Sequence, residues 1–270
     1  MDVKKVLLVS QEIDPYLTGT AMADFSRLMA LKLQEKGAEV RCFMPRYGAI
    51  NERRNQLHEV IRLSGLNISI DDTDHPLIIK VATLQPTRLQ VYFIDNDDYF
   101  CRHTQQKSLE TDDDPETNDE RAIFFVRGVI ETVKKLRWNP DLVICVGWIT
   151  ALVPLYLRSI YSEDPSFAEN KIVYAISGKA FDGELDKRMV DKLLQEGLSE
   201  ELVKSIATED GLIDFERLNR MAIDFSDAAI DSGADSNQVA LDYAKASGKP
   251  FMPFDESNDS SDYFDFFKSL

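Results

Sequence analysis

The sequence predicts an α/β fold built on a mostly parallel sheet. Short apolar runs alternate along the chain with longer stretches of helical periodicity, which is the pattern of repeated strand–helix units. Residues 141–145 are almost continuously apolar, as strands of a parallel sheet are when both of their faces are buried. Residues 59–94 instead hold several β-like runs close together, which indicates a small antiparallel excursion. Together these observations predict a doubly wound, Rossmann-like sheet that carries this excursion.

The strands and helices expected from these patterns follow one another in regular order. We expect strands at residues 6–9, 39–44, 60–63, 77–81, 89–94, 141–145, 171–176 and 228–230. We expect helical segments at residues 22–36, 121–136, 150–161, 185–207, 214–225 and 237–246. Gly37 is a typical stop for the first helix, and Pro154 is tolerated in the first turn of the third. Asp235 or Ser236 is the expected N-cap of the last helix.

The net charge of −16 is unevenly distributed along the chain. Residues 110–120 carry seven acidic side chains and no Lys or Arg, and residues 254–270 carry five acidic side chains against Lys268. The rest of the chain is only mildly acidic, which argues against nucleic acid or an anionic membrane as a partner. We expect one domain over residues 1–250 and an acidic–aromatic tail over residues 251–270. The aromatic side chains of this tail either pack back on the domain or dock on a partner.

The cysteines, histidines and apolar runs argue against several kinds of protein. Cys42, Cys101 and Cys145 lie far apart, which fits reduced core thiols rather than a disulfide framework or a zinc site. The three histidines also lack ligand spacing, and the aspartates of residues 95–98 lack the spacing of a calcium loop. We therefore expect no metal site and no cofactor. No apolar run approaches the roughly 18 residues of a membrane span, and no leader-like segment precedes the first strand, so we expect a cytoplasmic protein.

The most informative motif is the turn after the first strand. An apolar run that feeds a turn and then a helix is where open α/β proteins bind anionic groups, because the first N–H groups of the helix lack partners. Residues 9–25 have this form and read VSQEIDPYLTGTAMADF. The segment resembles the opening of glycogen and starch synthases, which runs approximately S-E-x-x-P-x-x-K-x-G-G-L-A-D. The residues that match are Glu12, Pro15, Ala23 and Asp24.

The resemblance to this family continues in the same order for about 230 residues. Further similar segments are PRYGAINERR (45–54), VYFIDNDDYF (91–100), NDERAIFF (118–125), LRWNPDLVICVGWITALVPLYL (136–157), AISGKAFDG (175–183) and LNRMAIDFSDAAID (218–231). The resemblance implies the N-terminal half of a two-domain glycosyltransferase that transfers glucose from ADP-glucose to a glucan. The charged residues 51–54 within the first of these segments are expected to lie on the surface.

The chain departs from the family pattern at the positions where the resemblance implies contact with ADP-glucose and the glucan end. The lysine and the two glycines of the first motif fall on Thr18, Thr20 and Ala21. The three histidines and the aspartate of the family's H-C-H-D-W-H-T-A motif fall on Ile144, Val146, Ile149 and Gly147. The histidine and asparagine of the later I-H-N segment fall on Ser177 and Gly178. Apolar side chains cannot donate a hydrogen bond or stabilise a departing phosphate.

These departures lead us to expect a family member that is inactive alone and has a glucan-binding, scaffold or regulatory role. Only twenty residues follow Pro250, so we expect the family's second, nucleotide-binding domain to be absent from this chain. One alternative is half of a split glycosyltransferase, completed by a separate nucleotide-binding chain. Another is a repurposed fold that binds an unrelated small ligand at the C-terminal edge of the sheet. The expected partner is a glucan or a protein, and the sequence leaves the oligomeric state open.

No catalytic residue is expected, and any surviving site is expected to be a remnant crevice. Its candidate ligand-binding residues are Glu12, Tyr16, Thr18, Asp24, Trp148 and Ser177. Three of them also have a structural explanation. Glu12 can hold backbone N–H groups of the turn, Asp24 can face the positive end of the helix dipole, and Trp148 can belong to the core.

Overall fold

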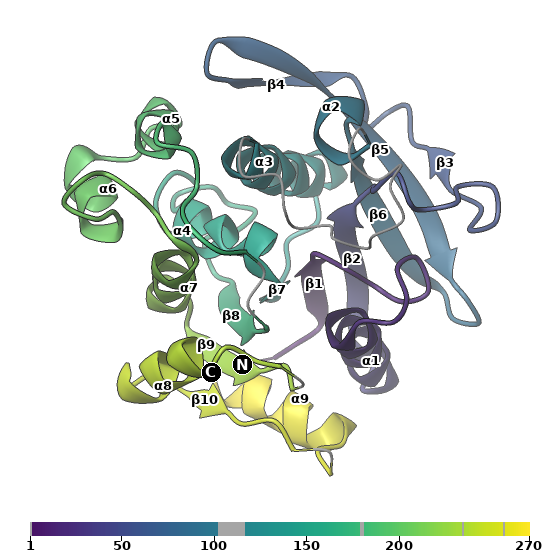
Figure 1. Ribbon diagram of the computed structural model, residues 1–270. Helices are drawn as coiled ribbons and strands as arrows, with labels where there is room; N and C mark the ends of the chain where they lie inside the picture. Colours follow the sequence, from purple (N-terminus) through teal and green to yellow (C-terminus); the bar gives the residue numbers. More distant parts are fainter. Residues whose placement is uncertain (1, 102–116, 179–180, 234, 256) are drawn as a thin grey trace.

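Figure 1 shows an α/β molecule with one central sheet and helices on both of its faces. The computed structural model describes residues 2–101, 117–178, 181–233, 235–255 and 257–270. Most of the acidic stretch at residues 110–120 therefore lies outside the described residues. Within the described ranges, no helix is both long enough and apolar enough to cross a membrane.

Parallel strands form the body of the sheet, and the chain adds them on both sides of the first strand. They are β1 (Lys5–Ser10), β2 (Glu39–Pro45), β6 (Leu89–Asp95), β7 (Leu142–Val146), β8 (Lys171–Ile176), β9 (Ala228–Asp231) and β10 (Phe251–Met252). Their order in space is β10-β9-β8-β7-β1-β2-β6. The chain thus builds outward from β1 through β2 to β6, and then from β7 to β10 on the other side. This is the doubly wound topology, and it confirms the predicted fold class.

An antiparallel extension continues the sheet beyond β6. It consists of β3 (His58–Glu59), β4 (Leu66–Ile70) and the long β5 (Thr73–Leu84), which pairs with β6, β3 and β4. The predicted excursion is confirmed, but the strand expected at residues 60–63 is wrong. These residues form a turn in which the Leu63 N–H donates to the Val60 carbonyl at 2.9 Å, and Ile61 is 82% exposed. Residues 66–70 pair with β5 instead, because this strand can bury Ile68 and Ile70 against the helix α3 (Asn118–Leu136).

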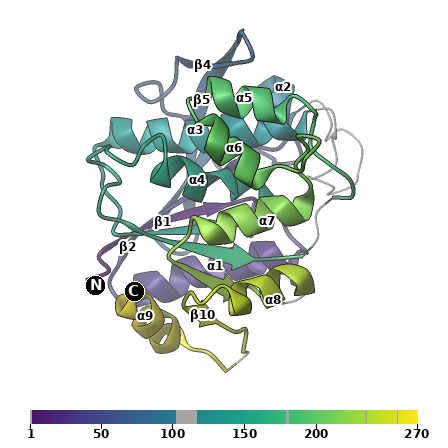
Figure 2. The same ribbon diagram turned by 90° about the vertical axis from the view of Figure 1, so that its left-hand side faces the viewer.

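Helices cover the sheet in two layers, as Figure 2 shows. One layer holds α1 (Ala21–Glu35), α8 (Gln238–Ala246) and α9 (Ser260–Ser269). The other holds α3 (Asn118–Leu136), α4 (Leu152–Arg158) and α7 (Phe215–Asp224), with α5 (Met189–Gln195) and α6 (Glu200–Ile206) outside them. The short α2 (Asp97–Phe100) follows β6, and a 3-10 helix, η1 (Trp148–Thr150), precedes α4.

Two details of the predicted helices need correction. The helical segment at residues 185–207 is divided into α5 and α6, because Gly197 adopts a φ of +102° that only glycine takes up readily. The N-cap of α8 is Asn237 rather than Asp235 or Ser236, since its side chain accepts a backbone N–H from the first turn at 3.1 Å. The other predicted helices are present, with ends that differ by a few residues.

The residues after position 250 pack on the same body. Strand β10 pairs with β9, and α9, capped by Asp259, lies against α1. Tyr263 and Phe267 of α9 are buried, and the ammonium group of Lys32 in α1 lies 4.8 Å from the centre of the Tyr263 ring. These aromatic side chains therefore pack back on the domain, while the division of the chain at residue 250 stays a prediction.

Candidate functional site

The turn after β1 and the turn after β7 meet at the C-terminal edge of the sheet, where the strand order reverses. The two strands are neighbours, with Val9 opposite Cys145 and Ser10 opposite Val146. The N–H of Gln11 donates to the Val146 carbonyl at 2.9 Å, so the first residue of the β1 turn is tied to β7. Open α/β sheets bind ligands at such a reversal, because the diverging connections leave a crevice beyond the strand ends. This is the place at which the sequence predicts the remnant crevice.

Gly147 closes this crevice from the side of β7. Its φ of +88° lies in the left-handed region that favours glycine. A Cβ atom at this position would lie 2.7 Å from the Cβ of Gln11 and 2.9 Å from the Sδ of Met22, which is closer than packed atoms approach. No side chain therefore fits at Gly147 unless the β1 turn or α1 moves.

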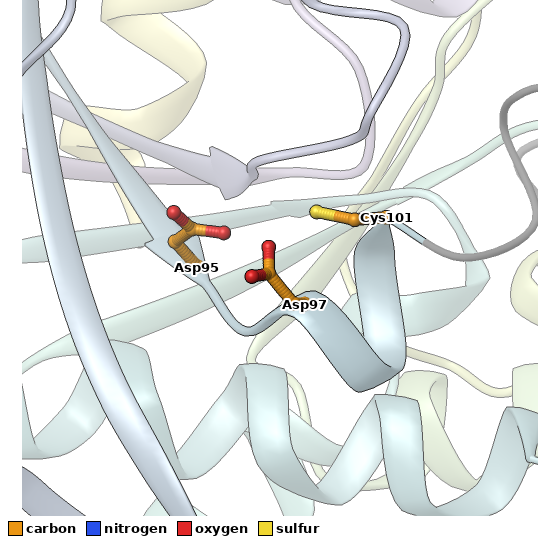
Figure 3. Close-up of side chains that lie close together, drawn as sticks. All are labelled: Asp95, Asp97 and Cys101. Atoms are coloured by element: carbon orange, nitrogen blue, oxygen red, sulfur yellow. The ribbon is translucent and has the colours of Figure 1, made fainter.

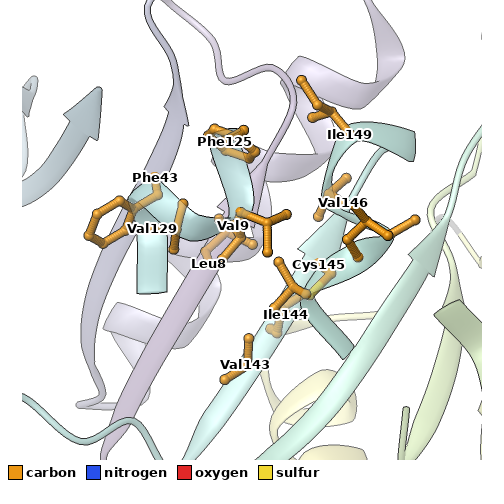
Figure 4. Packing of buried hydrophobic residues seen from close by; sticks show 14 of the residues in the cluster. Leu8, Val9, Phe43, Phe125, Val129, Val143, Ile144, Cys145, Val146 and Ile149 are labelled. Atoms are coloured by element: carbon orange, nitrogen blue, oxygen red, sulfur yellow. The ribbon is translucent and has the colours of Figure 1, made fainter. Parts of the chain in front are cut away.

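Apolar side chains fill the space around the end of β7. Ile144, Val146 and Ile149 are all fully or almost fully buried. Figure 4 shows them near Val9 of β1 and Phe125 of α3, which are buried in the same cluster. None of these side chains can donate a hydrogen bond, so this part of the crevice is core rather than binding surface.

Trp148 belongs to an aromatic cluster that continues this core. Its side chain is 2% exposed and packs edge-to-face on Phe181, with 5.2 Å between the ring centroids. Phe181 packs in the same way on Phe215 of α7, at 5.3 Å. Such edge-to-face pairs stabilise a core beyond the area they bury. The indole ring is therefore engaged on its own protein and presents no open face to a sugar.

Glu12 is turned into the turn after β1 rather than toward solvent. Its side chain is buried, and its carboxylate accepts the hydroxyl of Thr20. The same Thr20 oxygen accepts the Ala23 N–H at 3.1 Å and so caps α1. The Glu12 carboxylate thus helps to hold the turn that leads into α1.

Asp24 and Ser177 lie on separate elements, in α1 and at the end of β8. Asp24 is exposed in the first turn of α1, where its N–H donates to the Thr20 carbonyl at 3.2 Å. Ser177 is buried at the end of β8, and its carbonyl accepts the N–H of Asn237, the N-cap of α8, at 3.0 Å. The loop before α8 also covers Gly178, where a Cβ atom would lie 2.9 Å from a carbonyl oxygen of that loop. Gly178, on which the asparagine of the family's I-H-N segment falls, is therefore covered by the loop before α8.

Tyr16 and Thr18 are the two candidate residues that lie together at a hollow of the surface, where Thr18 is exposed and Tyr16 is only 7% exposed. They line a hollow of about 400 Å³ on the outer side of the β1 turn. A second hollow of about 260 Å³ adjoins it and shares its residues Pro15, Tyr16, Arg54 and Asn55. The remaining lining residues are Thr18, Ala49 and Asn51 in the first hollow and Gln56, Thr83 and Gln85 in the second. These two hollows together form the outer groove.

A separate cluster of ligand-type atoms lies beyond the end of β6. One such atom from each of Asp95, Asp97 and Cys101 lies within 4.8 Å of the others. Figure 3 shows the three side chains close together. The two oxygens of Asp95 are already paired, one with Arg46 Nε at 2.9 Å and the other with Lys80 Nζ at 2.8 Å. Because two basic side chains balance this carboxylate, the cluster serves as an ion-pair network that ties β6 to β5 and to the end of β2.

Comparison with known proteins decides the family. A family model of the starch synthase catalytic domain matches residues 5–232. The chain belongs to this family. Glycogen synthase from Chlorobium limicola is 36% identical to it over 201 residues, and that from Chlorobium phaeobacteroides is 37% identical over 192 residues. These matches cover 74% and 71% of this chain but only 41% and 39% of the relatives, so the chain spans about two fifths of their length.

A solved starch synthase has the same fold. The catalytic domain of starch synthase IV from Arabidopsis thaliana, bound to ADP and acarbose, matches with a TM-score of 0.73 at 16% sequence identity. The match covers 94% of this chain and 51% of that one. The resemblance to glycogen and starch synthases that the sequence motifs carry is therefore confirmed, together with the α/β fold.

In this member of the starch synthase family, the departures from the family pattern gather at the closed crevice. The family's aspartate falls on Gly147, where no side chain fits, and its histidines fall on three buried apolar residues. One of its glycines falls on Thr20, which caps α1 and binds Glu12. Each of these residues belongs to the core or to a helix cap in this chain.

Proposed function

We propose that this chain does not transfer glucose by itself and has a glucan-binding, scaffold or regulatory role within the starch synthase family. The observation that carries the proposal is the filled crevice at the ends of β1 and β7. Gly147 lies too close to Gln11 for a side chain to fit, and Ile144, Val146 and Ile149 are buried in the core. These features support a former site that has become part of the folded core.

The chemistry of glucose transfer supports the same conclusion. Transfer from a nucleotide sugar needs preorganised donors where negative charge develops on the departing phosphate, and the loss of one such donor costs about 100-fold or more in rate. The apolar residues Ile144, Val146 and Ile149 cannot donate a hydrogen bond. The resemblance places the family's histidines at these positions, so the side chains there offer no donor to a departing phosphate.

The proposal includes a cytoplasmic location and a glucan or protein partner. The cysteines support the location, because no disulfide joins any of the three, as is usual in a reducing compartment. Burial raises the pKa of the Cys42 thiol to about 12 and also raises that of Cys145, so both stay protonated and unreactive at neutral pH.

Calorimetry with ADP-glucose and with maltoheptaose, combined with a glucose-transfer assay, tests the proposal. We expect heat of binding from maltoheptaose, none from ADP-glucose, and no incorporation of labelled glucose into glycogen. Binding of ADP-glucose followed by measurable transfer would overturn the proposal. Transfer that occurs only after a nucleotide-binding chain is added would instead favour the split glycosyltransferase. Binding of neither compound would restrict the role to a scaffold or regulatory protein.

A further inference from the structure

We propose that the outer groove binds a neutral, polyhydroxylated chain, a short segment of glucan, at a place separate from the filled crevice. The inference rests on the glucan-binding role proposed above and adds the site at which the glucan is held. Three segments that are far apart in the sequence form the groove: the turn after β1, the loop after β2, and the end of β5 with the turn that follows it (Figure 1).

The lining of the outer groove is rich in groups that both donate and accept hydrogen bonds. Four amide side chains and two aliphatic hydroxyls contribute, namely those of Asn51, Asn55, Gln56, Gln85, Thr18 and Thr83. The described residues that line the groove include no carboxylate. A sugar hydroxyl is itself both donor and acceptor, so amides and hydroxyls match it in either direction. Divalent metal sites are usually built around carboxylate, imidazole or thiolate ligands, and the described residues of this lining include none of these.

The floor of the groove is rigid and largely apolar. The ring of Tyr16 packs edge-to-face on Phe93, with 4.9 Å between the centroids, and its N–H donates to the Ile13 carbonyl at 3.0 Å. Burial raises the pKa of Tyr16, so its hydroxyl stays protonated. Pro15 lies beside it and is exposed. Small-ligand sites combine such apolar surface with a few polar groups, and a floor that is already fixed costs little ordering entropy on binding.

The wall formed by the loop after β2 is held by its own hydrogen bonds. The Asn51 carbonyl accepts the Asn55 side-chain amide at 3.0 Å, and the Asn51 side chain accepts the Arg54 N–H at 2.9 Å. Arg54 is exposed and lines both hollows. Among the described residues that line the groove it is the one charged side chain, and a guanidinium can donate several hydrogen bonds to neutral hydroxyl oxygens.

The dimensions of the outer groove suit an extended oligosaccharide. The larger hollow, about 400 Å³, lies within the range of about 300–1,000 Å³ that is usual for small-ligand sites. The smaller one, about 260 Å³, continues from it across the shared Pro15 and Tyr16. A linear chain of sugar units can therefore extend from one hollow into the next, which a compact ligand would not need.

Calorimetric titration of the whole chain with maltoheptaose tests the site. Asn55→Ala and Gln85→Ala each remove one amide, and we expect each to weaken binding about five- to tenfold, as the loss of one hydrogen bond does. Ala49→Arg places a long side chain in the larger hollow from an exposed position, so we expect a loss of about tenfold or more. Asn67→Ala is the matched control, because it removes an exposed amide from β4, outside the groove, and we expect unchanged binding.

The outcomes separate the groove from the broader role. If the wild-type chain binds maltoheptaose and all three groove variants bind it equally well, the groove is not the site, while the glucan-binding role stands. If the wild-type chain does not bind maltoheptaose, both the groove and the glucan-binding role are overturned. Binding of glucose 1-phosphate that Arg54→Ala abolishes, without binding of maltoheptaose, would overturn the neutral ligand in favour of a phosphorylated sugar.

Discussion

The inner and outer sides of the turn after β1 differ in packing, in charge and in access to solvent. On the inner side Gln11 and Glu12 are buried, and Gln11 lies against Gly147 so closely that no side chain fits between them. On the outer side Pro15 and Thr18 are exposed and open onto a groove lined by amides. A single turn of this starch synthase family member thus separates a sealed region from an accessible one.

The two sides of the turn therefore differ in what they contribute to the protein. The residues of the inner side serve packing and helix capping, so they contribute to the free energy of unfolding. On the outer side the exposed residues contribute little to folding and are free to bind a ligand. A substitution on the inner side that leaves stability unchanged would contradict this difference. A substitution on the outer side that strongly destabilises the protein would contradict it as well.

Trp148→Ala tests the inner side with the largest expected effect. The indole is almost fully buried against Phe181, so its truncation leaves a cavity in the aromatic cluster. We expect the free energy of unfolding to fall by about 3–5 kcal/mol in urea denaturation followed by circular dichroism. Ile61→Ala is the control, because this side chain is 82% exposed, and its change should stay within about 0.5 kcal/mol. Equal effects of the two variants would contradict a packed inner side.

Gly147→Asp restores the residue type of the family pattern and should destabilise the chain by about 3 kcal/mol. The cost has two sources, the positive φ and the collision with Gln11 and Met22. Gly37→Asp separates them, since Gly37 has a φ of +87° but nothing within 4 Å of an added Cβ. We expect the control to lose only about 1 kcal/mol, the cost of the backbone conformation. Equal losses in the same denaturation experiment would mean that the crevice has room for a side chain.

Thr20→Ala should lower the free energy of unfolding by about 1 kcal/mol, the usual effect of a lost N-cap. The substitution removes the acceptor for the Ala23 N–H and the hydroxyl that binds the Glu12 carboxylate. Thr18→Ser is a suitable control on the outer side, because it keeps an exposed hydroxyl on the same turn. Thermal unfolding of both variants measures the difference, and a stability of Thr20→Ala equal to wild type would contradict the capping role.

Thr18→Ala has the smallest expected effect on stability, and it tests binding and stability at the same residue. Because Thr18 is exposed, its removal should change the free energy of unfolding by less than about 0.5 kcal/mol. Loss of its hydroxyl from the outer groove should weaken maltoheptaose binding about threefold in calorimetry. The opposite result, with reduced stability and unchanged binding, would assign Thr18 to the fold rather than to the groove.

Much of the framework could be predicted because it follows from local periodicity. The strand expected at residues 171–176 has those bounds, and the Gly37 stop follows α1 closely. Predictions failed where local signals compete. The apolar residues 60–63 resemble a strand but form a turn, and three polar residues before α8 are all good caps although only Asn237 has the required geometry. Such choices depend on pairing and loop path, which sequence patterns do not contain.

The site was harder to predict than the fold. Sequence motifs placed the candidate residues at the ends of β1, β7 and β8, which the sheet brings to one edge, while ligand binding there stays a prediction. They did not reveal Asn55 or Gln85, because an amide in a loop carries no periodic signal. Residues 51–54 were expected only to be surface charge, whereas Asn51 and Arg54 help to line the outer groove.

The sequence by itself determined the family and most of the order of strands and helices. These properties depend on backbone periodicity and on ordered motifs, both of which are local in the chain. The tertiary structure alone decided that Gly147 lies against Gln11 and Met22, and that Asn55 and Gln85 share one groove. Contacts of this kind join segments far apart in the sequence, and they arise only once the strands have paired and the loops have crossed the sheet.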